Sequence, residues 1–198
     1  MANVLDALDT DRVHYYDPKQ DKTAKLIEKT LYLGHVKTCT VREVAVKGKY
    51  KAKVFNYSVE LAKENGKETF HTSNGTAVDG GAFVGREVWG TGVFFFLNPS
   101  EGDDFEANNG GNEVYLKFCE GLGIECPTTE IEVDGETRSV LTLPDLETTD
   151  AIGKPVKAYV DYAKVRDKDG SYNPRLRVKS VVAWTGGEVK EVDADLPF

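Results

Sequence analysis

Three lysines and two aromatic residues occupy alternate positions at the start of the segment KYKAKVFNYSVEL. Side chains of a β-strand alternate between its two faces, so Lys49, Lys51, Lys53, Phe55 and Tyr57 are predicted to share one face. Ammonium groups neutralise phosphates, and aromatic rings stack on unpaired bases with about 1–3 kcal/mol per base. This combination favours the binding of a single-stranded nucleic acid, because a duplex offers no unpaired bases to the rings.

A second strand-like segment, PRLRVKSVVAW, repeats the basic pattern nearer the C-terminus. Arg175, Arg177 and Lys179 alternate with apolar residues there and would also project to one side. A simpler interpretation is that these cations keep solvated or edge strands from aggregating, with Phe55 and Tyr57 turned into the core at a bulge. The repetition on two strands favours the nucleic-acid interpretation.

The glycine-rich segment GREVWGTG supplies two further candidates. Arg86 and Trp89 are expected at the rim of the binding surface, where glycines permit close approach of a backbone, although these glycines suit a bent barrel strand equally well. The aromatic run VFFFL at residues 93–97 could also be a stacking platform, but it is more typical of a strand buried on both faces.

Charge is sorted along the chain, although the net charge is −8. Residues 30–60 hold six Lys/Arg against two acids, and residues 151–185 hold eight against three. Residues 101–150 instead hold fourteen acids against two basic residues. Sorted charge creates local potentials that a net value hides, so the two basic regions remain compatible with a polyanionic ligand.

Signatures of catalysis and of metal binding are weak. No GxxxxGK[ST] phosphate-binding loop occurs in the sequence. The acids of residues 101–150 could hold a divalent metal for a nuclease, but a solvated acidic surface is the simpler interpretation. Cys39, Cys119 and Cys126 are too few for a disulfide framework and lack the paired spacing of zinc ligands. We therefore expect no enzyme, no catalytic residue, no cofactor and no metal site.

Period-two patterns predict strands over residues 31–46 and 49–61 with a turn at Lys47-Gly48 between them. Asn65-Gly66 is expected to form a type I′ turn that folds VELAK back on KETFH. A short amphipathic helix is predicted from an N-cap at Asn112 to about Gly121. Residues 23–29 carry a weaker helical pattern. The helix that ends near Gly121 is followed by a predicted hairpin with its turn at Asp134-Gly135. Two further strands, joined by a loop over residues 166–173, are predicted after the hairpin.

This order of elements predicts a mainly β chain. We expect a five-stranded OB-type barrel with extra hairpins and one short helix between the third and fourth barrel strands, while an SH3-like or other small barrel stays open. The chain divides into an N-terminal arm (1–29), the barrel domain (30–185) and an acidic, flexible C-terminal tail (186–198). The absence of a long apolar run and of a basic, apolar leader predicts a cytoplasmic protein without membrane contact.

The chain ends on EVDADLPF. This ending resembles the acidic tip of bacterial and bacteriophage single-stranded DNA-binding proteins, which finish on several aspartates, an aliphatic residue, proline and phenylalanine. The segments KYKAKVFNYSVEL and GKPVKAYVDYAKVRDKDGSYNPRLRVKSVVAW look like parts of a bacteriophage-type single-stranded DNA-binding protein with an OB-fold. The tail departs from the bacterial proteins because it lacks their long Gly/Gln/Pro-rich linker, so its reach should be smaller.

The resemblance implies sequence-tolerant binding of single-stranded DNA in phage DNA replication, recombination or repair, in the host cell cytoplasm. It also implies that the tip recruits replication or recombination proteins, with the terminal ring in an apolar pocket of the partner and the carboxylates adding charge steering. The residues that match the tip are Asp193, Asp195, Leu196, Pro197 and Phe198. A metal-dependent nuclease and a phage structural protein remain alternatives, and the sequence leaves a homo-oligomer open.

Overall fold

The structure is a computed structural model of the 198-residue chain, and it describes residues 25–46, 50–97, 105–133 and 135–191. Antiparallel strands dominate it, which confirms the prediction of a mainly β chain. Within the described residues, no helix is long and apolar enough to cross a membrane.

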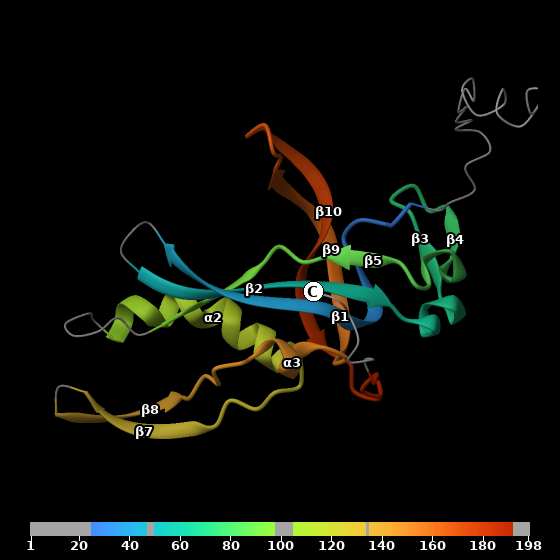
Figure 1. Cartoon of the computed structure of the whole chain (residues 1–198). Coiled ribbons are helices and arrows are strands. Elements are labelled where there is room, and N and C mark those ends of the chain that lie inside the picture. Colours follow the sequence, from blue (N-terminus) through green and yellow to red (C-terminus); the bar gives the residue numbers. More distant parts are fainter. Residues whose placement is uncertain (1–24, 47–49, 98–104, 134, 192–198) are drawn as a thin grey trace, which may run out of the picture.

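One curved sheet contains six strands in the order β10-β9-β1-β2-β5, with β6 also paired to β2 (Figure 1). Every strand pair in it is antiparallel. Its members are β1 (Thr30–Val46), β2 (Tyr50–Leu61), β5 (Glu87–Trp89), β6 (Val93–Phe96), β9 (Pro155–Arg166) and β10 (Tyr172–Ala183). The period-two patterns therefore predicted the two long hairpins, β1–β2 and β9–β10, correctly.

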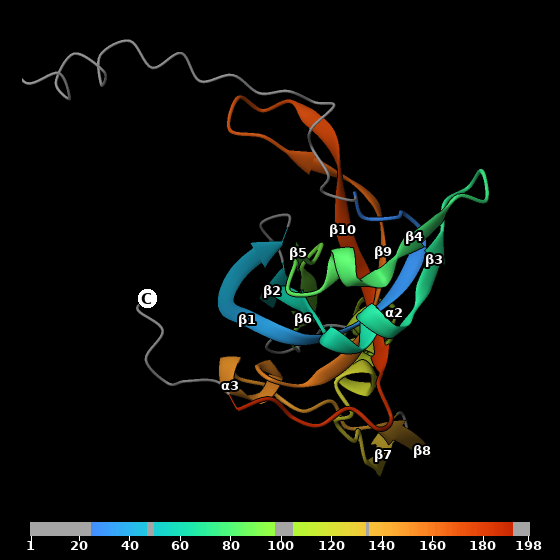
Figure 2. The same ribbon diagram turned by 90° about the vertical axis from the view of Figure 1, so that its right-hand side faces the viewer.

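The two ends of this sheet approach each other. Val178 of β10 forms an isolated parallel bridge with Gly90, the residue after β5. Beside it, the Thr91 amide donates a hydrogen bond of 3.1 Å to the Val178 carbonyl. Register shifts after Val178 in β10 and after Val36 in β1 bend both strands, as bulges do. The curvature of β1 is visible in Figure 2.

Helix α2 (Phe105–Gly121) covers one face of the sheet, and aromatic rings fill the contact. The Tyr115 ring centroid lies 4.3 Å from that of Phe95 and 5.3 Å from that of Phe55. The Phe118 ring centroid lies 5.1 Å from that of Tyr57. Burial of these rings contributes much of the apolar stabilisation of the core. We call this side of β1, β2, β5 and β6 the helix-covered face, and the opposite side the outer face.

Helix α2 is longer than predicted, because Asn112 lies inside it and does not cap it. The Asn112 side chain instead binds the backbone of Phe96. Its Oδ1 accepts a hydrogen bond of 2.8 Å from the Phe96 amide, and its Nδ2 donates one of 3.0 Å to the Phe96 carbonyl. The side-chain amide thus replaces the strand neighbour that β6 lacks at its free edge. A second short helix, α3 (Thr148–Ala151), has no counterpart in the predicted elements.

The predicted type I′ turn at Asn65-Gly66 is wrong. A 3₁₀ turn, η1 (Lys63–Lys67), follows β2, and the next strand β3 (Thr69–His71) pairs with β4 (Ala77–Asp79) and not with β2. Asn65 is buried, and its amide accepts from the Leu33 backbone nitrogen at 3.0 Å and donates to the Leu33 carbonyl at 2.7 Å. This contact with β1 outweighs the local turn preference of the Asn-Gly pair. A further 3₁₀ turn, η2 (Gly80–Phe83), leads to β5.

The predicted hairpin in the acidic region is confirmed. Strands β7 (Thr128–Val133) and β8 (Glu136–Leu141) pair only with each other among the described strands. Gly135 in the turn adopts a φ of 78°, a conformation that glycine accepts at no steric cost; Asp134 lies outside the described residues. Figure 1 shows the hairpin projecting from the body of the protein.

The two ends of the described chain both lie against the sheet. Residues 25–29 are not helical, in contrast to the prediction. The Ile27 amide donates a hydrogen bond of 2.7 Å to the Tyr32 hydroxyl, which fixes this segment on β1. Near the other end, the Lys190 amide donates to the Gly153 carbonyl at 3.0 Å, and the His35 Nε2 lies 3.0 Å from the Glu188 carbonyl oxygen. The first residues of the predicted tail are therefore held in place.

Candidate nucleic-acid interface

The basic and aromatic residues of β2 alternate as predicted, but they lie on the helix-covered face. Phe55 and Tyr57 are buried in the core, at 0% and 1% exposure, against the rings of α2. Their predicted role in stacking on bases is therefore wrong, because no base can reach them. Burial also raises the pKa of the Tyr57 hydroxyl, since the phenolate would be desolvated.

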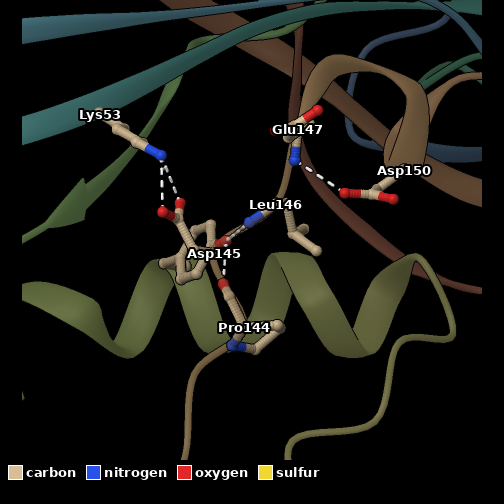
Figure 3. Close-up of polar contacts among 7 residues, drawn as sticks. Lys53, Pro144, Asp145, Leu146, Glu147 and Asp150 are labelled. Carbon is tan, nitrogen blue, oxygen red and sulfur yellow. Dashed lines mark hydrogen bonds and ion pairs between the residues drawn. The ribbon is translucent and has the colours of Figure 1, made fainter.

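Lys53 points to the same side and already has an anionic partner. Its Nζ lies 2.6 Å and 2.7 Å from the two carboxylate oxygens of Asp145 (Figure 3). The segment that carries Asp145 is fixed by Tyr115, whose hydroxyl donates to the Pro144 carbonyl at 2.6 Å and accepts from the Leu146 amide at 3.3 Å. Lys53 thus ties β2 to the segment before α3, and its charge is neutralised there.

The other two predicted lysines of this strand cannot be placed at the outer face either. Lys51 is exposed but shares the side of Lys53, and its carbonyl accepts a hydrogen bond of 3.0 Å from the Leu97 amide. Lys49 lies outside the described residues.

The outer face carries two exposed rings. Trp89 stands directly opposite Ser58 of β2 and is 47% exposed. Phe94 stands opposite Val54 and is 40% exposed, and Arg42 of β1 is an exposed cation opposite the same Val54. Directly opposite residues of an antiparallel pair share a face, so these side chains form one surface. Asn56 lies between Val54 and Ser58 on the same face of β2. We call Arg42, Asn56, Trp89 and Phe94 the outer-face patch.

Phe94 was left out of the predicted site because the core interpretation of the run VFFFL was preferred over a stacking platform. Alternation within the run separates its rings: Phe95 packs on Tyr115 under α2, while Phe94 turns outward and stacks on Phe96 with centroids 6.3 Å apart. Strict period-two counting inside the run could have placed one of these rings in solvent.

Two of the predicted cations on β10 lie beside Trp89. The bridge between Gly90 and Val178 sets Arg177 and Lys179, the neighbours of Val178, next to the segment that follows Trp89. Burial, with a contribution from Arg175, lowers the pKa of the Arg177 guanidinium from its usual value. Two cations and an exposed ring therefore lie on neighbouring backbone segments where β10 touches the end of β5.

Arg175 and Arg86 have other contacts. The Arg175 guanidinium forms an ion pair with Asp167, across the β9–β10 connection. Arg86 lies with its guanidinium carbon 5.8 Å from the centroid of the Phe83 ring, which belongs to the core. Arg86, which precedes β5, therefore packs over the core, and the predicted rim of Arg86 and Trp89 is not formed.

An ion network closes one end of the outer face. Glu60 lies 3.2 Å from the Lys37 ammonium and 2.6 Å from that of Lys190, and Lys37 also reaches Glu87 at 3.3 Å. The hydrogen bond from Lys190 is the main reason why the pKa of Glu60 lies below its ordinary value. Each exposed ion pair of this kind contributes little to the free energy of unfolding. Through Lys190, however, the network anchors the tail segment. This segment lies beside the Trp184 ring, whose centroid is 5.4 Å from that of the His35 ring.

Two further exposed rings were missed on the β9–β10 hairpin. Tyr162 and Tyr172 are 51% and 64% exposed. Tyr162 alternates with Lys164 and Arg166 along β9, a pattern that the sequence already displays. The predicted tip residues Asp193, Asp195, Leu196, Pro197 and Phe198 lie outside the described residues.

Within the described residues, no three His, Cys, Asp or Glu side chains come close enough to hold a metal ion. The chain matches no protein-family model, no curated protein and no solved structure. What the protein does must therefore be inferred from its own residues and their geometry.

Proposed function

We propose that the protein is a non-catalytic, sequence-tolerant binder of single-stranded DNA. The observation that carries this proposal is the outer-face patch, where Trp89 and Phe94 leave large rings in water beside Arg42. Exposed rings stack on any base, because every base has a π-face, so binding through them does not depend on sequence. Arg177 and Lys179, next to Trp89, supply further positive charge for the phosphates.

The fold that we propose for this activity is an OB-type barrel. Its support is the order of the elements: β1, β2 and the pair β5/β6 form a meander, α2 follows, and β9 and β10 complete the set. The parallel bridge between Gly90 and Val178 brings the last strand back to the third. OB-folds bind oligonucleotides on the face of strands 2 and 3, and the outer-face patch occupies that position.

The biological setting of this proposal rests on the resemblance of the chain end. A binder of single strands that carries an acidic tip ending on Phe198 suits replication, recombination or repair of phage DNA, where partner proteins must be brought to exposed strands. In this proposal the barrel holds the strand, and Asp193–Phe198 recruits the partner.

Tryptophan fluorescence tests the proposal with a built-in control. In a Trp184→Phe variant, Trp89 reports alone, and titration with oligo-dT should quench it, because base stacking covers the indole. A Trp89→Phe variant retains only Trp184, which lies away from the patch beside His35, and should show little quenching. The affinity should fall with salt by about 0.7 log units per log unit for each phosphate contact.

Four results would each contradict the proposal. Equal or tighter binding of duplex would show that the exposed rings do not stack on bases. An affinity that does not change with salt concentration would show that the cations do not contact phosphates. Failure to bind single strands at low salt would favour a structural protein. Cleavage of a labelled oligonucleotide in Mg²⁺ or Mn²⁺ would favour a nuclease.

A further inference from the structure

The hairpin β7–β8 presents two unpaired acids on one face, while Glu136 and Arg138 on its other face form an ion pair. Glu130 and Glu132 alternate with Ile131 and therefore project together, opposite Ser139 and Thr137. Among the described residues, no cation forms an ion pair with either carboxylate. A two-stranded hairpin that pairs with no other strand is marginally stable in water, so it gains from a partner.

The β9–β10 hairpin carries a surface of opposite character. Tyr162, Lys164 and Arg166 lie on one face of β9, and Tyr172 of β10 stands opposite Arg166 on the same face. Both tyrosines are exposed, and among the described residues neither Lys164 nor Arg166 forms an ion pair. Arg175 and Arg177 alternate onto the other face, so these exposed residues are separate from the cations beside Trp89.

The two hairpins of one molecule lie too far apart to meet. Figures 1 and 2 both show β7–β8 projecting from one end of the body and β9–β10 from the opposite end. The acidic face of one hairpin and the basic face of the other can therefore pair with each other only between two molecules.

We propose that the acidic face of the β7–β8 hairpin of one molecule docks on the Tyr162/Lys164/Arg166 face of the β9–β10 hairpin of the next. The contact joins unlike surfaces, so each molecule keeps one free donor and one free acceptor hairpin, and the array stays open. A row of molecules along one strand follows from this geometry.

The contact is weak without a template. Two hairpin faces bury less surface than a stable protein interface, and salt screens exposed charges. Neighbouring molecules on one DNA strand, however, face each other at an effective concentration in the millimolar range. Cooperative binding to long strands is thus the expected consequence, and that part rests on the proposed function.

A charge swap tests the contact itself. Wild type should show concentration-dependent self-association by sedimentation velocity at low salt, and the variants Glu130→Lys/Glu132→Lys and Lys164→Glu/Arg166→Glu should each lose it. An equimolar mixture of the two should regain it, because every contact between unlike variants is again between opposite charges. A Glu125→Lys/Glu136→Lys variant, with the same change of net charge off the acidic face, should behave as wild type. Far-UV circular dichroism checks that each variant is folded.

A second measurement compares long poly-dT with an oligo-dT that holds one molecule. Wild type should bind the long strand about tenfold more tightly per site, within the usual range of coupling between sites, and each swap variant alone should lose this gain. A mixture that associates no better than its separate components would overturn the proposed contact. Failure of wild type to bind the short oligo-dT would instead contradict the proposed function. The sedimentation test of the contact would be unaffected by that result.

Discussion

Lys53 and Asp145, which are far apart in the sequence, form a two-oxygen ion pair on the helix-covered face, with Nζ–O distances of 2.6 Å and 2.7 Å. The lysine is mostly covered, at 20% side-chain exposure, whereas the carboxylate is 58% exposed. The cation that the sequence pattern assigned to a phosphate is therefore engaged inside the protein, and this has a measurable consequence.

We expect Lys53→Met to change DNA binding little, whereas Arg42→Gln should weaken it. The methionine keeps the apolar part of the side chain, and the exposed Asp145 can be solvated, so unfolding free energy should fall by about 1 kcal/mol or less. The slope of log affinity against log salt should drop by about 0.7 for Arg42→Gln and stay unchanged for Lys53→Met. A larger loss of DNA affinity for Lys53→Met than for Arg42→Gln would mean that Lys53 contacts the DNA.

Phe94→Ala and Phe55→Ala should separate binding from stability. Loss of the exposed Phe94 ring should cost about 1–3 kcal/mol of oligo-dT affinity with little change in melting temperature. Loss of the buried Phe55 ring should cost about 3–5 kcal/mol of unfolding free energy because it leaves a cavity under Tyr115. Denaturant titration and oligo-dT titration of both variants give the comparison, and a Phe94 variant that binds normally would remove this ring from the patch.

Asn65→Ala should destabilise the protein by about 1–3 kcal/mol, because the Leu33 amide and carbonyl would lose their partner in a buried place. Asn74→Ala is a matched control, since Asn74 is an exposed turn residue that bonds only its neighbours Thr72 and Thr76. Urea unfolding should show a much smaller change for the control. Equal effects would mean that Asn65 acts only through its turn.

The anchor of the tail segment should weaken in acid. The folded-state pKa of Glu60 lies below its ordinary value of 4.5, so its contribution is present above that value and is lost as pH falls through the folded pKa. The nuclear magnetic resonance shift of the Lys190 amide, followed from pH 5.5 downwards, should move with a midpoint below 4.5. Glu60→Gln should abolish this transition, and a transition that persists in the variant would assign it to another group.

Deletion of Asp193–Phe198 should leave oligo-dT affinity unchanged or raise it, because the removed residues include carboxylates that repel phosphates. Capture of replication or recombination proteins by the immobilised protein should be lost at the same time. A deletion that abolishes DNA binding would contradict the separate roles proposed for the barrel and the tip.

The long hairpins could be predicted from sequence because alternation is a local property. The face of β2 that α2 covers could not be predicted, since Val54 on one side and Phe55 on the other are both apolar and both buried. The position of α2 decides between them, and that is a contact between distant segments. For this reason the predicted lysine-aromatic face was correct as an alternation and wrong as a binding surface.

Asparagine showed the same limit twice. Asn65 and Asn112 each carry a sequence signal for a local motif, a turn and a helix cap. In the fold each binds the backbone of a strand, Leu33 and Phe96 respectively. A side-chain amide can imitate a peptide group, and nothing in the neighbouring residues reveals which backbone it will meet.

The bridge between Gly90 and Val178 also bears on how the chain reaches this fold. Its partners are widely separated in sequence, so their meeting closes a long loop and cannot occur before β9 and β10 have been synthesised. We expect folding to begin in the local β1–β2 hairpin and to end when this seam closes, which makes the last step slow. Until then both unpaired edges are open to other chains, and a nascent molecule is most prone to aggregate in that interval.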